Sequence, residues 1–74
     1  MPRKLRQLRA DLKKAGWYKA RQVGSHEQWK HPLLPNALIP LAGHDGDDAD
    51  QYQERDIRKG VQAAHDAEKK GRLP

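Results

Sequence analysis

The sequence predicts a small α+β domain in which a helix, three antiparallel strands and a second helix follow one another and form two layers. Apolar residues recur at spacings of three and four near both ends of the chain, which is the pattern of a helix with one buried face. Between them lie short alternating runs, divided by Gly-Ser and Pro-Asn pairs that are typical of turns. Two helices packed on one face of a small sheet would bury the apolar surface of all five elements.

The first helix is expected from Arg3 to Ala15. Arginine and lysine cover most of its surface, and its apolar residues fall on one stripe formed by Leu5, Leu8, Leu12 and Ala15. Lys13 and Lys14 suit the negative C-terminal end of a helix. Gly16 is a typical residue just beyond such an end.

The three strands are expected at Trp17–Gln22, His26–His31 and Ala37–Ile39. Gly24-Ser25 provides the turn that joins the first two strands as a hairpin. Pro32 is expected to end the second strand, because proline cannot donate a hydrogen bond to a neighbouring strand. Pro35-Asn36 is expected to form the next turn, and Pro40 to end the third strand.

An acidic loop follows, and the second helix is expected from Gln51 to Lys70. Asp50 and Gln53 match the capping box found at the start of many helices. Gly60 interrupts a stripe of small apolar residues, where it costs about 1 kcal/mol relative to alanine. This cost indicates that another part of the chain approaches the helix backbone closely at Gly60.

The composition limits the possible functions. The 74 residues are enough for one domain with a small core, and we expect a single domain over 1–74 with a frayed tail at 71–74. The chain has no cysteine, no apolar run that could span a membrane and no stretch like a signal peptide, so we expect a cytoplasmic protein. The net charge of +5 favours nucleic acid as a partner, and an acidic protein surface would suit it equally well.

The second strand places its side chains alternately on two faces. His26, Gln28 and Lys30 share one face, and Glu27, Trp29 and His31 share the other. The face with Trp29 should pack on the helices. The open face then presents His26, which can exchange protons near neutrality, beside the phosphate-attracting charge of Lys30. Arg21 on the first strand joins them if the hairpin register gives it the right face.

Other readings of the histidines and acids are less favoured. His26 and His31 should point to opposite faces, and the acidic residues near His44 lack the spacing of a calcium loop, so we expect no metal site. His31 beside Trp29 suits packing and hydrogen bonding. Trp17 and Tyr18 are expected in the core and at its rim rather than as platforms for RNA bases.

A longer pattern surrounds His26. After the amphipathic helix, the chain contains a set of residues at defined spacings: Gly16-Trp17, Arg21, Gly24-Ser25-His26, Trp29 and His31-Pro32. This pattern resembles the HicA family of toxin ribonucleases. The resemblance is strong over residues 3–32 and extends through the third strand to Gly43-His44.

The resemblance implies a fold like that of the double-stranded RNA-binding domain and an activity that cleaves mRNA without a metal cofactor. It also implies a partner antitoxin, HicB, that covers the active site and assembles with the toxin. The family's catalytic histidine follows the Gly-Ser turn, which is the position of His26 here. In its C-terminal half the chain departs from the family pattern, with the acidic loop 45–50 and a longer helix containing Gly60.

We therefore expect a ribonuclease in which His26 removes the proton of an RNA 2′-OH, whose oxygen attacks the adjacent phosphate and leaves a 2′,3′-cyclic phosphate. Lys30 and Arg21 would stabilise the phosphate oxygens, and Ser25 and Gln28 are further candidates for RNA contact. No cofactor is expected. Two alternatives stay open: a non-catalytic RNA-binding module on the same fold, and an adaptor whose basic face meets an acidic protein.

Overall fold

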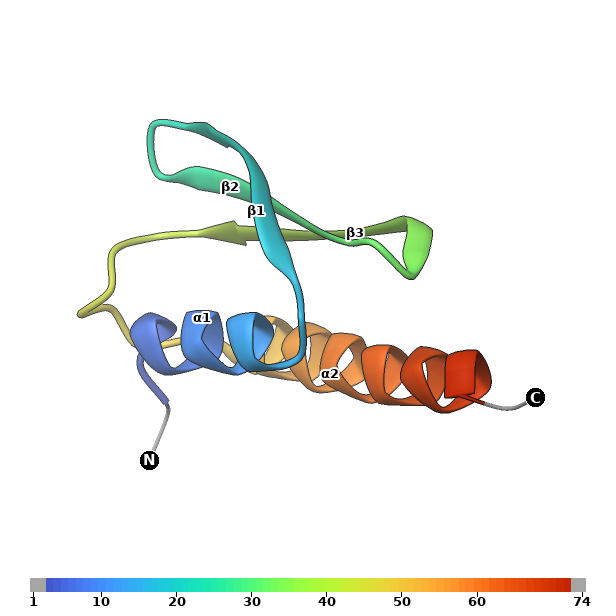
Figure 1. The fold of residues 1–74 in the computed structure, drawn as a ribbon. Helices are drawn as coiled ribbons and strands as arrows, with labels where there is room; N and C mark the ends of the chain where they lie inside the picture. Colours follow the sequence, from blue (N-terminus) through green and yellow to red (C-terminus); the bar gives the residue numbers. More distant parts are fainter. Residues whose placement is uncertain (1–2, 73–74) are drawn as a thin grey trace.

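The computed structural model describes residues 3–72 and has the predicted order of elements (Figure 1). These are α1 (Leu5–Lys14), β1 (Tyr18–Val23), β2 (His26–His31), β3 (Leu34–Ala42) and α2 (Gln51–Arg72). The strands form one antiparallel sheet with β2 in the centre. Both helices lie side by side on one face of the sheet, and the other face is left open (Figure 1). The predicted two-layer α-β-β-β-α fold is confirmed.

Both helices have the predicted buried face or cap, although α1 is shorter than predicted at both ends and α2 extends two residues further. The buried stripe of α1 consists of Leu5, Leu8 and Leu12. At the start of α2, the Gln53 backbone N–H donates to the Asp50 carboxylate at 2.7 Å, and the Asp50 backbone N–H donates to the Gln53 side-chain oxygen at 3.0 Å. This confirms the predicted capping box.

The expected frayed tail is wrong for 71–72, because α2 continues through Gly71 to Arg72. The remaining two residues of that tail, 73–74, lie outside the described residues. Among residues 3–72, neither helix is long and apolar enough to cross a membrane.

The third strand is longer than predicted. It begins at Leu34, directly after a turn at Pro32-Leu33, and runs to Ala42. Pro35-Asn36 is therefore part of the strand and not a turn, and Pro40 does not end it. The reason is position: β3 lies at the edge of the sheet, where a proline is tolerated if its missing N–H faces away from the neighbouring strand.

The core lies between the sheet and the helices. Trp29 is 1% exposed there, as expected for its face of β2. Trp17 packs across α2, and its indole N–H donates to the Gly60 carbonyl oxygen at 3.1 Å. A Cβ atom on Gly60 would lie 3.3 Å from Cζ2 of Trp17 and would also collide with Ile39. The predicted close approach to the α2 backbone is thus confirmed, and an alanine there would require the buried Ile39 side chain to move.

Candidate active site

The β1–β2 hairpin delivers His26 to the open face of the sheet. Its two-residue turn is Gly24-Ser25, and Gly24 has a φ of +59°, a conformation that glycine adopts without steric cost. Val23 and His26 face each other across the turn as the last pair of the hairpin. The His26 side chain is exposed at the very start of β2. It is therefore held by a regular strand and is accessible to a large substrate.

Strand pairing decides which cations accompany His26. Arg21 pairs with Gln28, and Tyr18 pairs with Lys30. Directly paired residues point to the same face of a sheet, so Arg21 joins His26, Gln28 and Lys30 on the open face. A register shift between Lys19 and Arg21 gives Arg21 this face. The sequence alone left the face of Arg21 undecided, and the bulge settles it.

Spacing along the strand places the two cations at different distances from His26. His26 and Lys30 are four residues apart on β2, so their Cα atoms are about 13 Å apart at about 3.3 Å per residue. Arg21 lies opposite Gln28, midway between them, and is one diagonal step from His26. The long Arg21 side chain is thus better placed than Lys30 to reach a group that contacts His26.

Ser25 is not part of this arrangement. It lies in the turn, where its carbonyl oxygen accepts a hydrogen bond from the Gly43 N–H at 3.2 Å. Ser25 lines a groove on the helix side of the sheet. Of the five predicted site residues, four share the open face and Ser25 lies round the tip of the hairpin.

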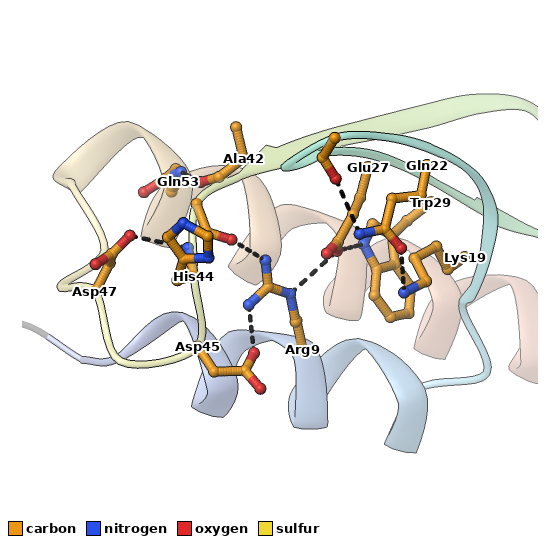
Figure 2. Close-up of polar contacts among 12 residues, drawn as sticks. Arg9, Lys19, Gln22, Glu27, Trp29, Ala42, His44, Asp45, Asp47 and Gln53 are labelled. Carbon is orange, nitrogen blue, oxygen red and sulfur yellow. Dashed lines mark hydrogen bonds and ion pairs between the residues drawn. The ribbon is translucent and has the colours of Figure 1, made fainter.

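A buried ion pair supports the strand that carries His26 (Figure 2). The Arg9 Nε–H donates to Oε1 of Glu27 at 3.0 Å, and the Trp29 indole N–H donates to the same oxygen at 2.9 Å. The side chain of Arg9 is 12% exposed and that of Glu27 is 6% exposed. Arg9 also donates to the Gly43 carbonyl oxygen at 2.6 Å and pairs with Asp45. We call these five residues the Arg9 network: Arg9, Glu27, Trp29, Gly43 and Asp45.

The Arg9 network was not predicted, because Arg9 is one of several arginines and lysines that cover most of the surface of α1. Burial acts to lower the pKa of Arg9, but its hydrogen bonds to Glu27 and Asp45 outweigh burial and leave the pKa above its usual value. One signal could have revealed the pair. Glu27 falls on the packed face of its strand, and a carboxylate there requires a buried cation or hydrogen-bond donors.

The comparison with protein families is decisive. A family model described as the HicA toxin of bacterial toxin-antitoxin systems matches residues 5–63. The chain belongs to the HicA toxin family. The matched region runs from the first residue of α1 into α2 and includes the whole sheet with its open face. Searches of curated proteins and of solved structures gave no match. Membership makes this chain the toxin of a toxin–antitoxin system and implies an antitoxin partner of the HicB type.

The second histidine of the HicA-like pattern is a structural residue. His31 is 4% exposed, its Nδ1 accepts a hydrogen bond from the Leu33 N–H at 3.1 Å, and its Nε2 lies 2.9 Å from the Ala15 carbonyl oxygen. The ring therefore carries its proton on Nε2 and donates to Ala15. It also meets the Trp17 ring edge-on at 5.5 Å between centroids. A Cβ on Gly16 would lie 2.8 Å from Nε2, so this part of the pattern packs the fold together.

The acidic loop of this HicA toxin ties the end of the sheet to α1. The Asp47 carboxylate accepts from the His44 N–H at 2.8 Å, and Asp48 pairs with Nζ of Lys4 at 2.5 Å. Asp45 belongs to the Arg9 network, and Asp50 caps α2. Within residues 3–72, no three acidic or histidine side chains gather as ligands for a metal ion would. The acids of this loop serve as local hydrogen-bond acceptors and ion-pair partners.

Proposed function

We propose that this HicA toxin is an endoribonuclease that cleaves mRNA, with His26 as the group that exchanges protons. His26 takes the proton of a 2′-OH, the 2′ oxygen bonds to the adjacent phosphorus, and the bond from phosphorus to the 5′ oxygen breaks. The leaving 5′ oxygen takes a proton from water, and the upstream product ends in a 2′,3′-cyclic phosphate. The observation that carries the proposal is the exposure of His26 on an open face that also presents Arg21 and Lys30.

The two cations have different roles in this proposal. Arg21, one diagonal step from His26, donates to the oxygens of the scissile phosphate, where a guanidinium can make two parallel hydrogen bonds. Lys30, about 13 Å from His26 along the strand, binds a phosphate further along the RNA. Gln28 lies between them and contacts the RNA there. General base catalysis contributes roughly 10²–10⁴-fold, and a positioned donor on the developing charge contributes a further 10²–10³-fold or so.

The same face is the proposed docking site of the HicB-type antitoxin. An antitoxin that covers the open face would exclude RNA from His26 and silence the toxin within a shared oligomer. The exposed Leu38 and the neighbouring Pro40 and Ala42 give the β3 side of this face an apolar strip. Such a strip beside a row of cations suits a protein surface with apolar and acidic groups. We place the toxin, its antitoxin and its mRNA substrate in the cytoplasm.

The experiment that tests the function is an analysis of product ends. Purified toxin is incubated with single-stranded RNA in the presence of EDTA, and the ends are identified by mass spectrometry. A 2′,3′-cyclic phosphate and a 5′-OH are expected. Ends with 3′-OH and 5′-phosphate, or activity that EDTA abolishes, would contradict the proposed chemistry. RNA that binds tightly without any cleavage would favour the non-catalytic RNA-binding module instead.

A further inference from the structure

A polar groove lies on the helix side of the sheet, next to the tip of the β1–β2 hairpin. It has a volume of about 440 Å³, within the range of small-molecule binding sites, and lies between the last turns of α1, the hairpin and the loop after β3. We propose that this groove binds a segment of single-stranded RNA next to the scissile phosphate, with Lys13 and Lys19 each binding a backbone phosphate. The inference rests on the proposed ribonuclease function and extends its substrate site.

The charges of the groove favour an anion. Its two carboxylates, those of Glu27 and Asp45, are already paired with Arg9. Lys13 makes no ion pair with any other part of residues 3–72, and Lys19 donates only to the neutral Gln22 side chain at 2.9 Å. With three cations and two carboxylates, the lining carries a net charge of +1, and its two ammonium groups can meet a ligand of opposite charge.

The groove is held by cross-element hydrogen bonds and adjoins the proposed catalytic group. Four members of the Arg9 network line it, and their contacts join α1, β2 and the loop after β3 (Figure 2); these members are Arg9, Glu27, Gly43 and Asp45. Ser25 lines the groove, and the next residue, His26, points to the open face. An RNA strand that passes over the Gly24-Ser25 turn would therefore place one part in the groove and the next part at His26. This path also gives Ser25 a position beside the RNA.

The lining suits RNA better than a protein segment. Exposed polar side chains surround the groove, and His44 and Gln22 can hydrogen-bond with the edges of a base. Apolar side chains, which form the core of most protein–protein interfaces, are absent from the described lining. Single-stranded nucleic acid is commonly bound in such positively charged grooves that follow its backbone.

The test compares two double variants of the full-length toxin. Lys13→Ala/Lys19→Ala removes the two ammonium groups of the groove. Lys59→Ala/Lys69→Ala removes the same charge from exposed positions on α2. Affinity for a short, mixed-sequence, single-stranded 2′-O-methyl RNA is measured by fluorescence anisotropy over a range of salt concentrations. This probe lacks the 2′-OH, so the proposed reaction cannot consume it.

The groove variant should lose about 1.4 from the slope of log affinity against log salt, at about 0.7 for each single-strand phosphate contact. When the salt concentration falls tenfold, the factor by which RNA affinity rises should therefore be about 25 times larger for the wild type than for the groove variant. The control variant should keep a slope close to that of the wild type. Equal slopes for the two double variants would overturn the proposal. It would also be overturned if the groove variant bound RNA like the wild type but lost binding to the antitoxin.

A second measurement follows the amide resonances of the wild-type toxin during titration with the same RNA. Signals of Ser25 and His44 should shift together with those of Gln28 and Lys30. Shifts confined to the open face would overturn the groove site and leave the proposed function intact. Cleavage that persists in His26→Ala would instead remove the proposed function, whatever the groove binds. A wild type with no affinity for RNA would remove both.

Discussion

The Arg9 network makes the strongest stability prediction, because it holds an ion pair almost out of contact with water. Arg9→Met removes the cation and retains a side chain of similar length. Glu27, only 6% exposed, then keeps a buried charge with no cation beside it, and the Trp29 N–H becomes its one side-chain donor. Removing one partner of a buried pair costs about 3–5 kcal/mol, whereas an exposed pair contributes about 0.2–1 kcal/mol.

This loss is large for a chain of 74 residues, whose free energy of unfolding should be about 4–11 kcal/mol. Glu27→Gln alone should cost less, because Arg9 keeps its contacts with Asp45 and the Gly43 carbonyl. The double variant Arg9→Met/Glu27→Gln should be more stable than Arg9→Met, since it no longer buries a lone carboxylate. We expect a coupling free energy of about 2 kcal/mol between the two sites.

The assay is urea unfolding of all four proteins, followed by far-UV circular dichroism at constant salt and pH. The free energies are comparable only if the dependence on urea concentration is the same in each variant. A loss below about 1 kcal/mol for Arg9→Met would show that the pair behaves as an exposed one. Additive effects of the two substitutions would likewise contradict the expected coupling, because they would show that the buried charges do not depend on each other.

Three further predictions concern α2 and the open face. Gly60→Ala should destabilise the fold by about 1–3 kcal/mol in urea unfolding, because its Cβ collides with core side chains and outweighs the gain in helix propensity. Gly71→Ala, with open space around its Cβ, should instead be neutral or stabilising by up to about 1 kcal/mol; equal losses would refute the packing argument. Asp50→Ala should cost about 0.5–2 kcal/mol through loss of the helix cap, and no change in the urea midpoint would contradict that role. In single-turnover RNA cleavage, Arg21→Ala should lower the rate by about 10²-fold, whereas Lys30→Ala should mainly raise the RNA concentration needed for half-maximal rate; the reverse would exchange the two roles.

The sequence predicts those features that depend on local periodicity. Alternation along β2 placed Trp29 in the core and His26 outside, and the structure has both there. The Asp50 cap and the close approach at Gly60 were likewise predictable, because each depends on one residue type at one position. The HicA-like pattern contains one buried and one exposed histidine: His31 packs in the fold, whereas His26 is exposed at the start of β2.

Features that depend on tertiary pairing were not predictable from the sequence. Pro40 lies within β3 because that strand is at the edge of the sheet, and strand order is not a local property. The face of Arg21 depends on a bulge in the hairpin. The partner of Glu27 is Arg9, which lies 18 residues earlier in the chain. Arg9 lies on α1 outside its leucine stripe, where the sequence pattern predicts a solvent-exposed residue.

The proposed function depends above all on His26 as the group that cleaves RNA. The most direct measurement is RNA cleavage in EDTA by the wild type, His26→Ala and His65→Ala, where His65 is an exposed histidine on α2 that serves as the control. We expect cleavage by the wild type and by His65→Ala, and none by a folded His26→Ala that still binds RNA. Cleavage by His26→Ala at the wild-type rate would contradict this expectation.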